Sequence, residues 1–366
     1  MNVVDYLVKK DDFSVRKWSE SPLPEEIAEG EILLRIDKFA FTANNLSYAT
    51  AGEGIGYWRL FPTEEGWGRI PVWGFADVVA SKCDEVPVGE RVYGFFPMSS
   101  HLVMKPSAIK SERFMDLAES RQSLPPLYNV YERLSSETCE YKELEDEQML
   151  FFPLFGTSFI VHDFLLDNEN FGADNVIISS ASSKTALGTA GLIHKDPRLD
   201  VRVIGLTSPK NKEFCESLGY YDQVFAYGEI ESLPENLDSV FLDYTGDSQI
   251  MERVAARLGE HVKHGTVVGF THNAMAGGIE SEALNRSNSA GYKLFFAPVR
   301  FAKRFQDWGA EGLRYRIYEA WFSLVQDAKA WGDMRRLRGK SEVDAVYEDA
   351  LQGNFQPTTL YSLSVA

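Results

Sequence analysis

Short apolar runs alternate with helical patterns through the middle of the chain. The run at residues 176–178 is followed by small residues and then by residues 187–193, whose apolar positions recur at helical spacing. A second apolar run, residues 201–206, begins about 25 residues after the first. A buried strand, a helix and a second buried strand predict a βαβ unit with a right-handed crossover.

The same alternation continues toward the C-terminus and predicts a doubly wound parallel sheet. Further strands are expected at residues 223–227, 239–243, 266–270 and 293–298. Further helices are expected at residues 209–218, 250–258, 302–331 and 342–352, before a closing strand at residues 359–363.

The first 110 residues have short segments of alternating apolar and polar positions. Strands are expected at residues 31–37, 71–80, 91–96 and 101–104, and this spacing predicts a small β-barrel. The polar segment at residues 111–148 is expected to be a helical insertion. Its charged run at residues 137–147 is expected to be a solvated face.

Composition narrows the classes of function. The 366 residues suggest about two domains, and a formal net charge of −17 disfavours binding to nucleic acid or to an anionic membrane. The three cysteines are isolated and the N-terminus has no apolar signal core, so a cytoplasmic location is expected. Residues 150–166 are apolar but too short and interrupted to span a bilayer.

The turn after the first strand of the βαβ unit is the candidate phosphate site, because such turns present N–H groups at a helix N-terminus. Serines, an alanine and a lysine replace the glycines usual in dinucleotide-binding turns. The candidate contacts are Ser180, Ala181, Ser182, Ser183, Lys184 and Thr185. A βαβ unit with a purely structural turn stays open as the alternative.

Six motifs follow one another in a recognisable order: residues 29–36 (EGEILLRI), 87–95 (PVGERVYGF), 176–188, 214–219 (FCESLG), 264–270 (HGTVVGF) and 350–355 (ALQGNF). Their order resembles the medium-chain dehydrogenase/reductase superfamily, nearest its zinc-free quinone-oxidoreductase and enoyl-reductase branch. The resemblance implies an α/β protein with a GroES-like β-barrel and a Rossmann domain. Residues 1–150 and 301–366 would form the barrel, with an insertion at about 110–148, and residues 151–300 the Rossmann domain.

Zinc-dependent members of that superfamily need a cysteine in the first barrel segment and a Gly-His-Glu after it. Residues 41–45 read FTANN and residues 73–76 read WGFA, so no zinc or other metal site is expected. The four-cysteine structural zinc lobe is absent as well.

Residues after the second strand bear on the choice of cofactor. NAD-binding units place an acidic residue there, whereas this chain has Ser208, Lys210 and Lys212 and no Asp or Glu. Ser208 and Lys212 suit a 2′-phosphate, with Lys184 adding positive charge, so NADPH is expected rather than NADH. The alternative is that Lys210 and Lys212 are solvated residues at a helix start.

The resemblance also places candidate catalytic residues. Related reductases carry a functional asparagine or tyrosine in the segment that contains Asn44, Asn45 and Tyr48, and each of these could also be a turn former or a packed side chain. Contacts to the nicotinamide end of the cofactor are expected from Thr157, Gly269 and Thr271. Strand ends at the topological switch point are where such ligands lie.

An aromatic- and glycine-rich tract lies between the predicted barrel strands. It predicts a substrate cleft lined by Tyr57, Trp58, Trp67 and Trp73, unless it is an ordinary loop held by aromatic packing. The leading hypothesis is therefore an NADPH-dependent, zinc-independent reductase of an enone, quinone or enoyl thioester, and the resemblance suggests a homodimer. The alternatives are a non-redox enzyme, such as a lyase or an acyl-thioester binder, and a non-catalytic small-molecule binding protein.

Overall fold

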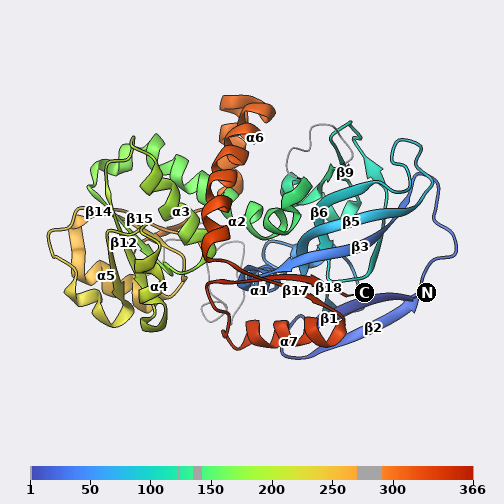
Figure 1. The fold of residues 1–366 in the computed structure, drawn as a ribbon, viewed down its shortest axis with the longest axis horizontal. Helices are drawn as coiled ribbons and strands as arrows, with labels where there is room; N and C mark the ends of the chain where they lie inside the picture. Colours follow the sequence, from blue (N-terminus) through green and yellow to red (C-terminus); the bar gives the residue numbers. More distant parts are fainter. Residues whose placement is uncertain (1, 123, 135–141, 270–290, 366) are drawn as a thin grey trace. The chain divides into compact units, whose positions relative to one another are not determined.

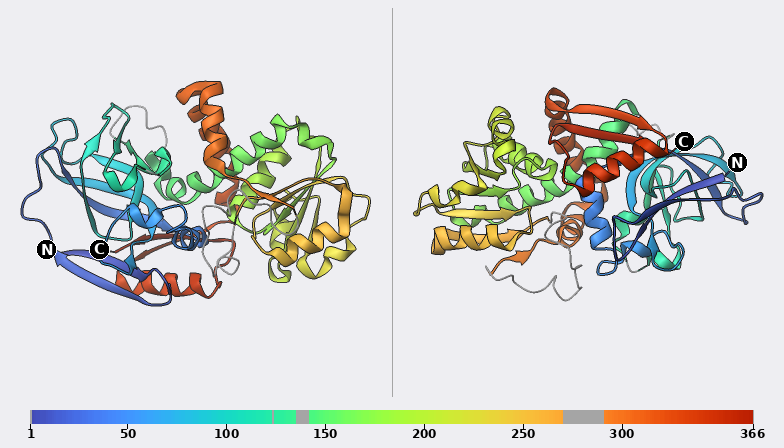
Figure 2. Two further views of the ribbon diagram at one scale, coloured as in Figure 1. Left: turned by 180° about the vertical axis from the view of Figure 1, so that it is seen from behind. Right: turned by 90° about the horizontal axis from the view of Figure 1, so that it is seen from below.

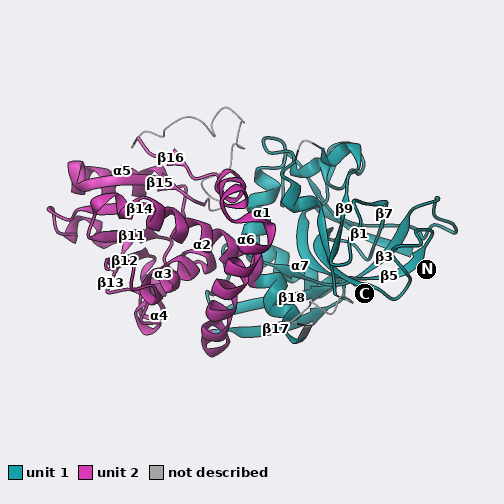
Figure 3. Cartoon of the chain, turned by 90° about the horizontal axis from the view of Figure 1, so that it is seen from above, with its two compact units in different colours: residues 1–150, 332–366 teal, residues 151–331 magenta. Residues whose placement is uncertain are grey.

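The chain folds into two compact units, drawn in Figure 3. The computed structural model describes residues 2–122, 124–134, 142–269 and 291–365. Unit 1 comprises residues 1–150 and 332–366, and unit 2 comprises residues 151–331. The units divide between residues 150 and 151 and between residues 331 and 332, whereas the domain boundaries were expected at residues 150 and 301. The difference arises because the helix expected at residues 302–331 packs on the parallel sheet of unit 2 through Trp331.

Unit 1 is mainly antiparallel β-structure (Figure 1). Its strands are β1 (Asn2–Lys9), β2 (Arg16–Pro22), β3 (Ile32–Phe41), β4 (Trp67–Gly68), β5 (Pro71–Ser81), β6 (Arg91–Pro97), β7 (His101–Met104), β8 (Pro106–Ser107), β9 (Arg113–Asp116), β10 (Val130–Arg133), β17 (Asp333–Arg338) and β18 (Thr359–Ser364). A nine-stranded sheet has the order β17-β18-β3-β5-β6-β10-β9-β8, with β7 paired to β3, and a second sheet has the order β2-β1-β4. Helices α1 (Ala43–Thr50) and α7 (Lys340–Leu351) complete the unit.

The segment expected to be a helical insertion instead contributes two short strands, β9 and β10, to the large sheet, so that expectation is wrong for these residues. β10 pairs with both β6 and β9. The helical parts described in this segment are the short turns η2 (Glu119–Arg121), η3 (Pro126–Asn129) and η4 (Lys142–Leu144), and the start of the helix that begins at Glu145. Phe114 and Tyr131 are fully buried and stack with ring centroids 5.6 Å apart. Gly94 leaves the space for Tyr131, because a Cβ at Gly94 would lie 2.4 Å from that ring. Tertiary packing of β-forming aromatics therefore outweighs the polar composition of the segment.

Helix α2 (Glu145–Asp167) joins the two units. The charged residues at its start are paired, not merely solvated: Asp146 binds Lys38 at 2.8 Å and Arg336 at 2.6 Å, and Glu145 binds Arg91 at 2.6 Å. Within the described residues α2 is the one helix long and apolar enough to cross a membrane, but 72% of its apolar window is buried inside the protein. Such burial is typical of a core helix.

Unit 2 contains a parallel sheet with helices on both faces (Figure 2). Its strands are β11 (Asn175–Ser179), β12 (Arg202–Thr207), β13 (Gln223–Ala226), β14 (Ser239–Asp243), β15 (Val262–Val267) and β16 (Lys293–Leu294). Its helices are α3 (Lys184–Lys195), α4 (Lys212–Ser217), α5 (Ser248–Leu258) and α6 (Ala297–Trp331), with short turns η5 (Glu169–Gly172), η6 (Pro209–Asn211), η7 (Tyr227–Ser232) and η8 (Gly259–His261). The strand order β13-β12-β11-β14-β15-β16 is that of a Rossmann sheet. All its strands are parallel, and the topological switch point, where the order of successive strands reverses, lies between β11 and β14.

Alternation along β11 explains the two layers of helices. Val176 and Ile178 belong to the core cluster that contains α3, whereas Ile177 belongs to the cluster that contains α5. Because successive side chains of a strand point to opposite faces, a strand that is apolar throughout is buried on both sides. The predicted doubly wound sheet is therefore confirmed.

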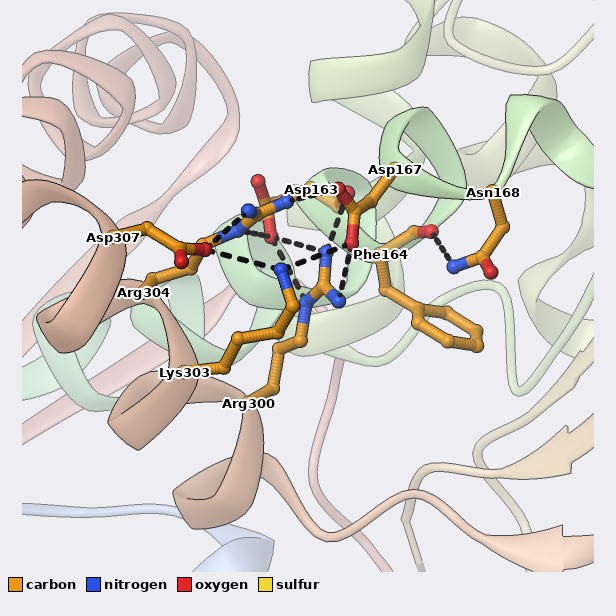
Figure 4. Close-up of polar contacts among 8 residues, drawn as sticks. All are labelled: Asp163, Phe164, Asp167, Asn168, Arg300, Lys303, Arg304 and Asp307. Carbon is orange, nitrogen blue, oxygen red and sulfur yellow. Dashed lines mark hydrogen bonds and ion pairs between the residues drawn. The ribbon is translucent and has the colours of Figure 1, made fainter.

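A cluster of ion pairs joins the end of α2 to the start of α6 within unit 2 (Figure 4). The carboxylate of Asp163 accepts from Arg300 at 2.8 Å and from Arg304 at 2.7 Å. Arg304 also binds Asp307 and Asp167, and the neighbouring guanidinium groups hold the pKa of Asp167 well below its ordinary value. The buried charges of Asp163 and Arg304 are paired and hydrogen-bonded, which is what their removal from water requires. Beyond the cluster, α6 breaks at Gly309, whose φ is 69°.

Candidate functional site

The candidate site of unit 2 begins at the turn between β11 and α3. Ser180 has a φ of 49°, in the left-handed region that favours glycine. A non-glycine residue there costs on the order of 1–3 kcal/mol. Ser180 therefore adopts the backbone conformation for which a dinucleotide-binding turn usually has a glycine.

Side chains from neighbouring strands support this turn. The Ser180 N–H donates to the Tyr227 hydroxyl at 3.1 Å, and the Tyr221 hydroxyl donates to the Ala181 carbonyl at 2.7 Å. Ser179 donates to the buried carboxylate of Asp243 at 2.5 Å. Tyr227 follows β13 and Asp243 ends β14, so these two supports come from the carboxyl edge of the sheet, where ligands of parallel α/β sheets bind.

Two buried hydroxyl groups at this edge lack partners. Within the described part of the chain, the Oγ atoms of Ser183 and Ser208 have no hydrogen-bond partner. Ser183 precedes the first residue of α3 and makes no side-chain capping bond, and Ser208 follows β12. Buried hydroxyls are normally hydrogen-bonded, so two such groups at adjacent strand ends fit a ligand rich in acceptor oxygens.

Lys184 is the first residue of α3 and is partly buried. Removal from water disfavours its charged form and lowers its pKa to about 8. A phosphate beside it would raise this pKa by favouring the charged form. Thr185 is also partly buried, and its carbonyl accepts from Ser158 at 2.7 Å. Gly188 makes this close approach feasible, because a Cβ there would lie 2.5 Å from the Ser158 hydroxyl.

The end of β12 adds polar groups to the same edge. Ser182 accepts from Asn211 at 2.9 Å, and Lys212 pairs with Glu229 at 2.8 Å. Sequence reasoning missed Asn211, Tyr227 and Glu229. Parallel strands end at one edge, so the residues that follow the third predicted strand carried a signal for Tyr227 and Glu229. Nothing in the sequence indicated that Asn211 contacts Ser182.

Two of the three residues expected to contact the nicotinamide end of the cofactor lie within the described part of the chain. The Thr157 hydroxyl donates to the Pro153 carbonyl within α2 at 3.3 Å. Gly269 follows β15 and donates its N–H to the Asp243 carbonyl at 3.3 Å, so it lies at the strand edge as expected. Thr271 lies outside the described residues.

Unit 1 carries a candidate site of its own, around α1. The Asn45 side chain accepts from the Thr42 N–H at 2.7 Å and donates to the Pro71 carbonyl at 3.0 Å. Both ends of its amide are therefore occupied, one by the start of α1 and the other by β5, which favours a structural role.

Tyr48 is partly exposed and lies among aromatic rings. Its ring centroid is 5.0 Å from Tyr57 and 5.3 Å from Phe95. Burial of the hydroxyl raises its pKa, and this outweighs the nearby Asn44 amide and Trp73 indole, which lower the pKa as donors. Tyr48 is therefore protonated at neutral pH and available as a proton donor.

The four aromatic residues expected to line one cleft do not lie together. Tyr57 and Trp73 belong to the cluster around Tyr48 and Phe95. Trp58 lies in the hydrophobic core of unit 1, pressed against Gly52 and Gly68. Trp67 packs under the Lys17 ammonium, which is 4.1 Å from its ring centroid. Within the described residues, no group of three or more His, Cys, Asp or Glu side chains is arranged to hold a metal ion.

Comparison with solved structures identifies the class of fold. CurA from Vibrio vulnificus in complex with NADPH is 13% identical, with a TM-score of 0.64 over 100% of this chain and 98% of that one. The quinone oxidoreductase from Coxiella burnetii is 15% identical, with a TM-score of 0.53 over 99% of both chains. CurK enoyl reductase is 14% identical, with a TM-score of 0.51 over 100% of this chain and 99% of that one. The fold is that of medium-chain dehydrogenases/reductases, with GroES-like and Rossmann domains, as expected.

The family of the chain follows from its sequence. A family model described as a protein of unknown function (DUF2855) matches residues 39–356, so the chain belongs to that family. Comparison with curated protein sequences finds no significant match.

Proposed function

We propose that this protein is an NADPH-dependent, zinc-independent reductase of an activated C=C or carbonyl group. The observation that carries the proposal is the pair of unpartnered buried hydroxyls, Ser183 and Ser208, at adjacent strand ends of a Rossmann sheet. NADPH is the ligand named for CurA, and it has phosphate groups for both positions.

The residues of unit 2 have distinct roles in this proposal. Ser183, Lys184 and the backbone N–H groups at the start of α3 would hold the pyrophosphate, where the helix dipole also favours negative charge. Ser208 and Lys212 would hold the 2′-phosphate, which requires Lys212 to exchange its bond to Glu229. When bound, the dinucleotide supplies a hydride.

Tyr48 would donate the proton that completes the reduction, or polarise the acceptor oxygen. Its raised pKa keeps the proton in place at neutral pH, and Asn44 lies close enough to orient the hydroxyl. Asn45 would hold α1 in place rather than take part in the chemistry.

Binding of NADPH tests the cofactor site directly. Ser183→Ala and Ser208→Ala are each expected to weaken NADPH binding about tenfold or more, because a hydrogen bond to a charged group contributes about 1.5–3 kcal/mol. Ser208→Ala should change NADH binding little, since NADH lacks the 2′-phosphate. Titration calorimetry and the ligand-induced rise in melting temperature would measure both effects.

Ser217→Ala is the matched control, because its hydroxyl donates to the Phe214 carbonyl at the end of α4. If the wild-type protein binds neither NADPH nor NADH, the proposed redox function is wrong. NADPH that binds but is not oxidised with enones, quinones or enoyl thioesters would favour the alternatives, a non-redox enzyme or a binding protein.

A further inference from the structure

The segment between β9 and β10 places a tyrosine in the aromatic cluster of unit 1. The hydroxyls of Tyr128 and Tyr57 are 2.8 Å apart, and the Tyr128 ring centroid is 5.1 Å from Phe95 and 6.4 Å from Trp73. Tyr48 also contacts this group through Tyr57 and Phe95. Tyr57 and Trp73 are nearly buried, whereas Tyr48 and Tyr128 remain partly exposed and form its accessible side.

Tyr128 is held in place by buried polar contacts. Arg121 is 1% exposed, pairs with Asp116 at 2.9 Å and donates to the Tyr128 carbonyl at 3.3 Å. The Asn129 amide in turn donates to the Arg121 carbonyl at 3.3 Å. These contacts hold the backbone of Tyr128, and the bond to Tyr57 holds its side chain, so little conformational freedom is lost when a ligand packs against it.

The cluster also contains a buried polar group without a partner of normal geometry. Trp73 is 9% exposed, and its indole nitrogen has no hydrogen-bond partner among the described residues, although it lies close enough to the Tyr48 hydroxyl to influence its pKa. Two donors, the Trp73 N–H and the Tyr48 O–H, are thus neighbours within a set of aromatic rings. That combination suits a carbonyl oxygen attached to a flat apolar group.

We infer that Tyr128 is a specificity-determining residue that selects ring-bearing conjugated ketones over linear ones, with Trp73 as a second donor to the carbonyl oxygen. This inference rests on the proposed reductase function. The ring of the ketone packs against Tyr57, Tyr128 and Phe95, and the carbonyl oxygen accepts from Trp73 and Tyr48. The segment from β9 to β10 then positions Tyr128 in the aromatic cluster.

The test uses two ketones that differ in one substituent: 4-phenyl-3-buten-2-one and 3-penten-2-one. Tyr128→Ala is expected to lower kcat/KM for the phenyl ketone on the order of tenfold, mostly through KM, and to leave the linear ketone nearly unchanged. Tyr128→Phe keeps the ring and should stay within a few-fold of wild type. Trp73→Phe should lower kcat/KM for both ketones by a similar factor, because both have the same carbonyl. Leu127→Ala, at an exposed position of the same turn, is the control.

Binding without turnover separates this inference from the proposed function. Quenching of tryptophan fluorescence by each ketone is measured for wild type and Tyr128→Ala, with and without NADPH. Phenyl-ketone binding that depends on Tyr128, in protein that never oxidises NADPH, would leave the inference standing and overturn the reductase. Reduction with an unchanged preference between the two ketones in Tyr128→Ala would overturn the inference, as would wild-type protein that binds neither ketone.

Discussion

At the scale of single residues, the turn between β11 and α3 keeps a left-handed conformation without a glycine, because other side chains support it. Ser180 takes up the left-handed conformation, and Tyr227 and Tyr221 bond to the backbone on either side of it. Tyr227 has a pKa raised to about 12 by burial, so its hydroxyl stays protonated. The sequence predicted a phosphate-binding turn at this position, and the end of the third predicted strand pointed to Tyr227. It did not indicate that Tyr221 supports the turn, because that contact depends on tertiary structure.

Replacing Ser180 by glycine tests the strain in this turn. Ser180→Gly should raise the free energy of unfolding by about 1 kcal/mol, because relief of the left-handed strain exceeds the entropy that glycine adds to the unfolded chain. Ser182→Gly is the control and should lower it, since Ser182 has no positive φ and accepts from Asn211. Denaturant unfolding measures both changes, and a destabilised Ser180→Gly protein would contradict the assignment.

Lys184 makes a pH dependence of cofactor binding testable. Its pKa of about 8 lies below the ordinary 10.5, and a bound pyrophosphate would raise it by favouring the charged form. NADPH affinity should therefore be level below pH 8 and fall as the pH rises above it. Lys184→Arg should remove this fall, because arginine stays charged. An affinity of the wild type that stays level between pH 7 and pH 10 would exclude a contact between Lys184 and phosphate.

The lowered pKa of Lys184 also affects the stability of the protein without ligand. The folded-state pKa of Lys184 is below the unfolded value, so the unfolded chain binds more protons between about pH 8 and pH 10.5. The contribution of Lys184 to the free energy of unfolding therefore increases with pH across this window. The difference in stability between wild type and Lys184→Met isolates it.

At the scale of elements, the strongly apolar strands could be predicted from the sequence, and the polar segment after β7 could not. The runs at 176–178 and 201–206 are buried on both faces, and burial of this kind leaves a clear pattern. β9 and β10 have only four residues each, and two buried aromatics, Phe114 and Tyr131, hold them. In strands this short, the hydrophobic pattern depends on very few residues, and the charged residues around them obscure it.

Arg121 tests how firmly this segment is held. Arg121→Ala leaves the Asp116 carboxylate buried without its cation, so it should lower the free energy of unfolding by about 3–5 kcal/mol. Arg113→Ala removes a more exposed arginine from β9 and should change stability by less than about 1 kcal/mol. Similar unfolding midpoints for the two variants would show that the buried pair contributes little.

At the scale of the whole molecule, the order of elements proved more informative than any one motif. Weak motifs in the right order predicted both folding units, although the structures with this fold are only 13–15% identical to the chain. The placement of α6 could not be predicted in this way. Its aromatic residues are compatible with either unit, and only packing shows that Trp321, Leu324 and Val325 belong to unit 2.

The place of β18 in the nine-stranded sheet has a consequence for biosynthesis. β18 lies between β3 and β17, so Leu363 pairs with Phe39 although more than 300 positions separate them along the chain. During translation, the stretch that forms the parallel sheet leaves the ribosome complete and can fold at once. The antiparallel sheet must wait until β18 has been synthesised, and a nascent chain stalled before β18 would hold an open edge beside β3.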